Sequence, residues 1–421
     1  MKVMKVMKVM RTARQWVVMT GVVTGIFSTT ALGQTNRFET PPSFTMRQVL
    51  PPVLQQSPYH TIVDPVRNDG FLNIYRMRTQ SGEYSVVGTD LLKIRVREAE
   101  AAAKLADVSA SGQMLKSAGR TATKPLKTGK DLVTRPGDTV KRTFRGVGRF
   151  FGRVGAGIDA TDPQREGVIA SITGASETKR RLAYKFGVDP YTQFAPLSKQ
   201  LSRLASAGAL GGTATGVGLA FVSGGAGVAI SVGGTSENLR ALLRDKSAAE
   251  LEKIGRNELA GMAVPATTIN AFYRNQFMTP TDKAVIVSAL KGLGAVEKQA
   301  AFVARAAQAA SLPRAFALRR RAELAASYHA KVSRINSFVT LGGVPMMRTA
   351  KGIIAIFPVD YLPWTQHLAE TARSVNRDKG KVAGAAPVEI WITGRASKRT
   401  SANFKKLGWS LVENAGARLG G

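Results

Sequence analysis

The chain of 421 residues contains no cysteine and only three histidines. The lack of cysteine excludes disulfides, thiolate nucleophiles and cysteine-ligated zinc. The histidines, His60, His329 and His367, do not stand at the spacings typical of metal sites. Glycine-rich phosphate-binding motifs and the nucleophile elbow of hydrolases are also missing. We therefore expect neither a metal nor a cofactor, and no motif identifies a reaction.

Acidic residues are scarce relative to basic ones. The chain has 28 Asp and Glu against 60 Lys and Arg, which gives a formal net charge of +32. Such an excess favours binding to any polyanion, including nucleic acid, anionic lipid and acidic polysaccharide. Aromatic residues make up only 7% of the chain and form no base-stacking motif, which argues against nucleic acid as the partner.

The apolar run near the N-terminus is too short to span a membrane. Residues 1–15 carry five positive charges and no negative charge, and about fifteen mostly apolar residues follow. A spanning helix needs roughly 20 apolar residues. Ala31 and Gly33 then stand at the small positions that precede a cleavage site. We expect a secretory signal over residues 1–33, and hence a protein exported to the periplasm or cell envelope. An uncleaved anchor or a buried helix is the alternative.

Composition and turn signals divide the rest of the chain into five parts. Short β-type runs separated by Asn-Asp-Gly and Ser-Gly turns indicate an antiparallel meander. Alternating strand and helix patterns near the C-terminus indicate a βαβαβ unit with parallel pairs. The expected parts are an extended leader (34–58), a β meander (59–88), a basic helical segment (89–200), a glycine-rich helical domain (201–335) and a small α/β unit (336–421). The fold class is therefore α+β with a mainly helical centre.

The stretch 204–234 has no charge and ten glycines, and small residues recur at every fourth position. Such a stripe lets another helix approach closely. We expect two close-packed helices, about 204–222 and 227–244, inside the helical domain. A re-entrant or spanning membrane hairpin is the alternative.

Between residues 116 and 153 there are eleven Lys and Arg but only two acids. On a helical projection the apolar residues from Val140 to Ile158 fall along one line, and the basic residues lie opposite, as in a helix at a membrane interface. An ordinary surface helix packed on the protein is the alternative. The candidate residues for contact with an anionic surface are Lys141, Arg142, Arg145, Arg149, Arg153, Phe144, Phe150 and Phe151. The basic run 319–321 is expected to be a solvent-facing helix side.

Two loops of the C-terminal unit are candidates for a ligand crevice, because ligands favour the carboxyl ends of parallel strands. These loops are 358–361 and 393–397. The second offers backbone N–H groups and an arginine at a helix start, an arrangement suited to an anion. The alternative is that both loops merely turn the chain. The candidate crevice residues are Asp360, Thr393, Gly394, Arg395 and Ser397.

Three stretches, "DPVRNDGFLNIYRMR", "GVGRFFGRVG" and "KFGVDPYTQFAPLSKQL", carry a resemblance to other proteins. They resemble a group of exported bacterial proteins to which no activity is assigned. The resemblance runs from about residue 60 to the "VEIWITG" stretch and beyond. It implies export and a shared fold, and it implies no catalytic residues.

Together these observations favour a non-catalytic binding or scaffolding protein at the cell envelope, in peripheral contact with anionic lipid or polysaccharide through the basic amphipathic segment. Two alternatives remain open at this point. One is an enzyme that acts on an anionic small molecule at the C-terminal crevice. The other is a nucleic-acid-binding protein, for which steeply salt-dependent affinity is expected.

Overall fold

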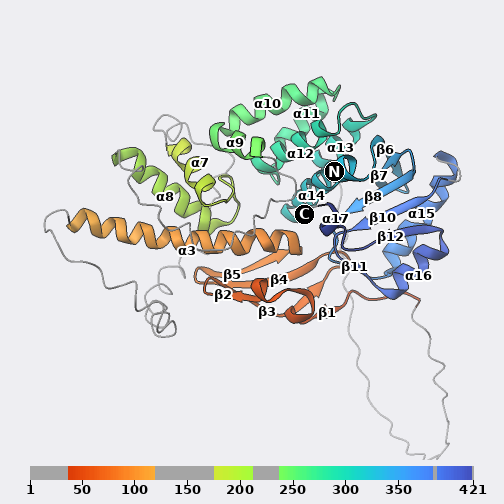
Figure 1. Cartoon of the computed structure of the whole chain (residues 1–421), viewed down its shortest axis with the longest axis horizontal. Coiled ribbons are helices and arrows are strands. Elements are labelled where there is room, and N and C mark those ends of the chain that lie inside the picture. The colour runs from red at the N-terminus through yellow and green to blue at the C-terminus, as the bar shows by residue number, and fades with distance from the viewer. Residues whose placement is uncertain (1–36, 119–174, 212–236, 383–385, 420–421) are drawn as a thin grey trace, which may run out of the picture. The chain divides into compact units, whose positions relative to one another are not determined.

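The computed structural model describes residues 37–118, 175–211, 237–382 and 386–419 (Figure 1). They form a mixed α+β fold, as the sequence predicted, and belong beyond Arg37 to one compact unit, Phe38–Gly421. The predicted signal and the candidate surface residues 141–153 lie outside the described residues.

An antiparallel sheet opens the described chain, and it contains the predicted meander. The meander strands are β3 (His60–Asn68), β4 (Asn73–Thr79) and β5 (Gly82–Val87). Two short strands, β1 (Ser43–Phe44) and β2 (Gln56–Ser57), pair with β3. Ile62, Tyr75 and Met77 are buried at alternate strand positions, so one face of the sheet meets the core.

The expectation of an extended leader over 34–58 is not met. Its described part contains two single-turn helices, α1 (Met46–Val49) and α2 (Pro52–Gln55), besides β1 and β2. Leu50 and Leu54 are buried in the core of the first sheet. The proline pairs that suggested an extended chain are compatible with this, because Pro52 stands at the first position of a helix, where proline costs no hydrogen bond.

Three helices pack with the first sheet: α3 (Thr89–Ala118), α7 (Ala175–Lys185) and α8 (Ala195–Gly211). Leu92, Leu105 and Leu197 join the core that the strands begin. Gly187 has a φ of +64°, which suits the predicted glycine end of the helix before it. The predicted basic helical segment thus contains α3 before residues 119–174, which lie outside the described residues, and α7 and the first part of α8 after them.

Six helices form the centre: α9 (Glu237–Asp245), α10 (Ala248–Gly261), α11 (Ala266–Arg274), α12 (Pro280–Gly292), α13 (Gln299–Ala307) and α14 (Leu312–Lys331). The predicted capping box of Ser247 and Glu250 starts α10. The two helices expected over 204–222 and 227–244 fall largely in 212–236, outside the described residues. No helix that the structure describes combines the length and apolar character needed to cross a bilayer.

The C-terminal sheet has the order β12-β10-β8-β7-β6. Its strands are β6 (Ile335–Leu341), β7 (Val344–Thr349), β8 (Gly352–Phe357), β10 (Val388–Ile392) and β12 (Trp409–Val412). The last three pair in parallel through α15 (Gln366–Val382) and α16 (Lys398–Lys406), so the βαβαβ prediction is confirmed. Strand β7 was not predicted, because Pro345 and two methionines give it no alternating pattern.

Helices cover both faces of this sheet (Figure 1). Ile354, Ile356 and Trp391 face a core shared with α14 and with α17 (Ala415–Leu419). Ile353, Ala355 and Ile390 face α15 and α16, which contribute Leu368, Ala372 and Phe404. Both crossover helices lie on one face because successive right-handed crossovers that move in one direction stay on the same side.

Candidate functional site

The two loops of the predicted crevice do meet, and they bond to each other. Strand β9 (Tyr361–Leu362) pairs in parallel with β11 (Arg395–Ala396). The N–H of Gly394 donates to the carbonyl of Val359 at 2.6 Å, and the N–H of Arg395 donates to the carbonyl of Asp360 at 3.0 Å. The Thr393 hydroxyl donates to Val359 at 3.0 Å. A Cβ on Gly394 would stand 1.9 Å from the Asp360 carbonyl oxygen, so the chain itself fills this point.

The carboxyl group of Asp360 forms hydrogen bonds with the first sheet and with the start of α3. It accepts the N–H of Asn73 at 2.8 Å and the N–H of Thr89 at 3.0 Å. Thr89 is the first residue of α3, and a carboxylate is stabilising at the positive end of a helix. Burial raises the pKa of Asp360 to about 6. This side chain therefore joins the end of the β8 segment to the first sheet.

The predicted anion position at the start of α16 is occupied by a carboxylate of the chain. Ser397 caps α16, because its hydroxyl accepts the N–H of Thr400 at 3.0 Å. The same hydroxyl donates to the Glu39 carboxylate at 2.5 Å, and the N–H of Trp364 donates to that carboxylate as well. Glu39 thus links the beginning of the described chain to the start of α16. The side chain of Arg395 is exposed.

The expectation for the run 319–321 was wrong, because all three arginines are buried. Arg319 donates to Asp282 at 3.1 Å and to Glu323 at 3.2 Å. Arg320 donates to Asp90 at 3.0 Å and to Glu323 at 2.5 Å. We call the set Asp90, Asp282, Arg319, Arg320 and Glu323 the buried ion cluster. It connects α3, α12 and α14.

Within the buried ion cluster, each group is kept in its charged form by the opposite charges beside it. Burial alone would raise the pKa of Asp90, but the charges of Arg320 and Lys93 lower it below its ordinary value. Burial opposes the charge of Arg319, yet Glu323 and Asp282 raise its pKa. Arg321 differs because its guanidinium donates to the carbonyl of Pro345 and lies 4.5 Å from the Phe357 ring centre. Burial lowers the pKa of Arg321 to about 10.

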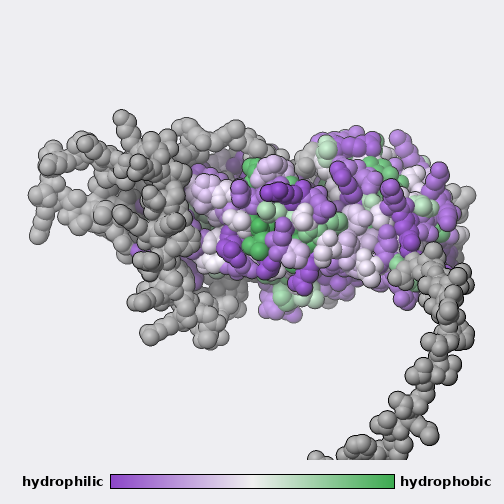
Figure 2. Space-filling model, turned by 90° about the horizontal axis from the view of Figure 1, so that it is seen from below, coloured by the Kyte–Doolittle hydropathy of each residue, from purple (hydrophilic) through white to green (hydrophobic). Residues whose placement is uncertain are grey.

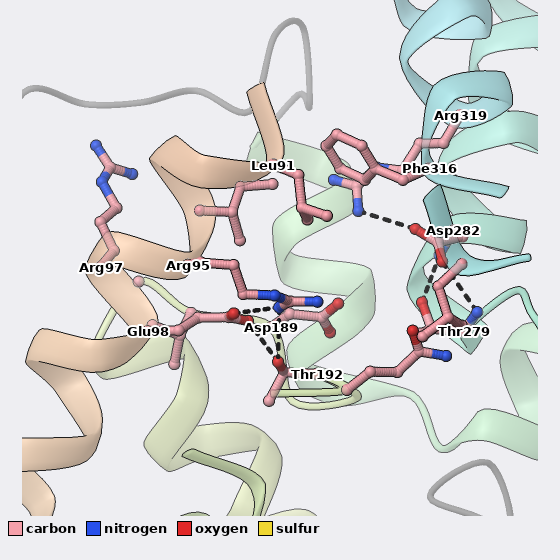
Figure 3. Close-up of a pocket in the computed structure, with 15 residues that line it drawn as sticks. Leu91, Arg95, Arg97, Glu98, Asp189, Thr192, Thr279, Asp282, Phe316 and Arg319 are labelled. Carbon is pink, nitrogen blue, oxygen red and sulfur yellow. Dashed lines mark hydrogen bonds and ion pairs between the residues drawn. The ribbon is translucent and has the colours of Figure 1, made fainter. Parts of the chain in front are cut away.

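A pocket of about 90 Å³ opens beside this cluster (Figure 3). Its walls come from the first turns of α3, the turn at 187–193, the start of α12 and the first turns of α14. At one end Glu98 pairs with Arg95 and accepts the hydroxyl of Thr192. At the other end Asp282 accepts the N–H of Thr279 at 3.0 Å and pairs with Arg319. Apolar residues line the space between: Leu91, Ile94, Leu312 and Phe316.

Asp189 contributes the third carboxyl group of the pocket. One of its oxygens accepts the Thr281 hydroxyl at 2.6 Å and the N–H of Tyr191 at 2.8 Å. Figure 3 shows Asp189 between the Arg95–Glu98 pair and the Asp282–Arg319 pair. Burial raises the pKa of Asp189 to about 6. The second oxygen has no hydrogen-bond donor among the described residues.

Helix α16 presents basic residues to solvent. Thr400 and Phe404 form its buried side, one turn apart. Its four basic residues are Lys398, Arg399, Lys405 and Lys406, and the helix contains no acid. The three lysines are exposed. We call Lys398, Lys405 and Lys406 the α16 lysine face.

Sequence reasoning found the C-terminal loops but missed the pocket. Asp189 stands in "GVDPYT", where it was assigned only to a turn, and Asp282 stands at a helix start, where acids are common. The run 319–321 was the one available signal, because three consecutive arginines cannot share one side of a helix. Within the ranges given above, no group of three His, Asp or Glu is placed to hold a metal ion. Comparisons with known protein families, with curated proteins and with solved structures found no match.

Proposed function

We propose that this protein is a non-catalytic binding or scaffolding protein that attaches to an anionic surface of the cell envelope. The observation that carries the proposal is the α16 lysine face, an outer helix side with three exposed lysines in a chain of net charge +32. Basic residues near an anionic bilayer contribute about 1 kcal/mol each. The amphipathic residues around Arg142 and Arg149 would add to this contact.

Two acidic residues beside the start of α16 accept hydrogen bonds from the chain itself. Glu39 accepts from Ser397 and Trp364, and Glu413 accepts the N–H of Ala396. The face of the molecule shown in Figure 2 carries mainly hydrophilic residues, and hydrophobic residues form small separate areas on it. Such a surface supports contact through charge rather than insertion of a broad apolar area.

The two alternatives gain less support. An enzyme at the C-terminal loops would need space for a substrate where the backbones of β9 and β11 bond to each other. A nucleic-acid binder would pair its positive charge with exposed aromatic residues for stacking. Among large apolar residues in the described ranges only Phe71 is an exposed aromatic, and it lies on the loop before β4.

Sedimentation with vesicles tests the proposal. Wild type is mixed with vesicles that contain phosphatidylglycerol or phosphatidylcholine alone. Two variants accompany it: one with Lys398, Lys405 and Lys406 changed to Gln, and one with Arg142, Arg145, Arg149 and Arg153 changed to Gln. A control replaces three exposed lysines elsewhere, Lys253, Lys298 and Lys351, with Gln, so that its net charge falls by as much as that of the α16 variant.

We expect wild type to sediment with the anionic vesicles only, and added salt to release it. Both test variants bind more weakly than the control. Equal sedimentation of the control and both variants would remove the proposal. Salt-sensitive binding to duplex DNA, without binding to vesicles, would favour the nucleic-acid alternative. Fractionation of native cells with a salt wash tests the location, which is expected to be peripheral to the envelope.

A further inference from the structure

The pocket between α3, α12 and α14 has no part in binding to an outer surface. Its volume of about 90 Å³ is enclosed by side chains from four segments far apart in sequence. Leu312, at the rim, is 42% exposed although it is a large apolar residue. A partly open apolar wall with a few polar groups at its base is the usual construction of a small-ligand site.

The carboxyl groups of the pocket differ in how their charges are balanced. Glu98 pairs with Arg95, and Asp282 pairs with Arg319. Asp189 has no ion-pair partner in the part of the chain that the structure describes, and it is half-buried in the pocket wall. The second oxygen of a half-buried carboxylate that lines a pocket can accept a hydrogen bond from a donor that enters the pocket. A cationic donor that entered the pocket would supply both the missing charge and the missing hydrogen bond.

We propose that this pocket binds a primary ammonium group on a short aliphatic stem. The ammonium donates to the free oxygen of Asp189, and the stem lies along Leu91, Ile94 and Phe316. Arg95 and Arg319 do not repel it strongly, because each is neutralised by its own carboxylate. Arg97 points away from the space between them (Figure 3). Such a group can come from a free alkylamine or from a lysine side chain of a peptide.

Titration calorimetry with two probes tests the inference on the full-length protein. Butylammonium represents the free amine, and Nα-acetyl-lysine methylamide represents the peptide side chain. The test variant is Asp189→Asn, which keeps the acceptor for Thr281 and Tyr191 and places an amide N–H₂ where the free oxygen stands. The control is Asp245→Asn, an exposed carboxylate outside the pocket.

We expect at least one probe to bind wild type and the control with one site, and to bind Asp189→Asn at least about tenfold more weakly. The probe that binds more tightly identifies the source. Equal affinity for wild type and Asp189→Asn, or no heat of binding to wild type with either probe, would overturn the inference. Leu312→Lys provides a second variant that is expected to fold, because the residue is exposed, and its added charge at the rim should weaken binding severalfold.

Acid should release the ammonium. The groups that face Asp189 are Asp282, which raises its pKa, and Arg319, which lowers it; Arg95 and Glu98 lie at the other end of the pocket. With a pKa of about 6, Asp189 is charged at pH 7.5 and mostly protonated at pH 5, so affinity should fall by about tenfold between these values. An affinity that stays constant over this range would contradict a contact with Asp189. Vesicle binding is a separate measurement, so this inference can fail while the proposed function stands.

Discussion

Two helices each carry a group of three basic residues, and the two groups lie in opposite surroundings. Residues 319–321 of α14 are buried, and Arg319 and Arg320 pair there with carboxylates, whereas the α16 lysine face is exposed. Successive residues on a helix are turned by about 100°, so three in a row span some 200° of its circumference. Burial of all three requires that α14 be covered on most sides, and it packs between α12 and β8. Helix α16 is covered only along Thr400 and Phe404.

A run of basic residues therefore does not by itself indicate whether it is buried or exposed. The neighbouring apolar pattern does, because the width of the apolar stripe tells how many sides of a helix are covered. On α14, buried residues such as Ala315, Leu318 and Ala322 occur beside the arginines. The same charges then serve different purposes: inside they balance carboxylates and hold helices together, and outside they remain available to a partner.

The largest expected effect comes from breaking the buried ion cluster. Glu323→Gln removes the carboxylate that Arg319 and Arg320 share, and leaves the two guanidiniums buried with less opposite charge. We expect the free energy of unfolding to fall by about 3–5 kcal/mol. Glu177→Gln is the matched control, because Glu177 pairs with Arg181 at the same helical spacing but in solvent. It should cost no more than about 1 kcal/mol. Urea denaturation measures both variants. Equal losses in the free energy of unfolding would contradict the claim that the buried ion pairs contribute more than the exposed ones.

A second change tests whether the loop that leads into α16 is held rigidly by the contact between Gly394 and Asp360. Gly394→Ala places a methyl group against the Asp360 carbonyl, and we expect a loss of about 2–3 kcal/mol in stability. Gly380→Ala in α15 has open space around it and should instead stabilise by up to about 1 kcal/mol. Thermal unfolding of the two variants distinguishes them. A neutral Gly394→Ala would show that β9 and β11 can separate, as a ligand crevice requires.

The third prediction concerns interior carboxylates that lack an arginine. Because the pKa of Asp360 in the folded protein is about 6, above its ordinary value, the folded state holds a proton that the unfolded state has released at pH 5. Its contribution to stability is therefore full below about pH 4 and is lost as the pH rises through 6. Asp360→Asn does not titrate. The stability of wild type relative to this variant should thus shrink by about 2 kcal/mol from pH 4 to pH 7.

Urea denaturation at several pH values measures this difference. A gap that stays constant, or grows with pH, would show that the Asp360 carboxyl is not held in its neutral form. Asp90 supplies the contrast within the same protein, because its pKa is lowered by Arg320 and Lys93. Its contribution is present at neutral pH and is lost as the pH falls.

The smallest effect is expected at Arg321, the arginine of the 319–321 run that has no carboxylate partner among the described residues. The charge of Arg305 adds to burial in lowering the pKa of Arg321, so the two guanidiniums repel each other. Arg305→Gln should therefore raise the free energy of unfolding by about 0.5 kcal/mol. Arg314→Gln, an exposed position on the same helix as Arg321, should leave stability unchanged. A destabilised Arg305→Gln would mean that Arg305 is held by attraction instead.

Much of the fold could be predicted from local pattern. The meander follows from turn residues at Asn68–Gly70, and the capping box at Ser247 marks a helix start. The βαβαβ order follows from alternating strand and helix signals. The rest depends on contacts between distant segments, which leave no local signal. Glu39 at the start of α16 and Asp189 beside Thr281 each meet partners far away in sequence.

The central claim is that interior arginines hold the fold while the α16 lysine face contacts an anionic partner. The most direct measurement is the partition of the Lys398, Lys405 and Lys406 to Gln variant onto phosphatidylglycerol vesicles, taken together with its free energy of unfolding. We expect the variant to keep the stability of wild type and to bind the vesicles with an affinity on the order of a hundredfold lower. Binding equal to that of the charge-matched control would contradict it.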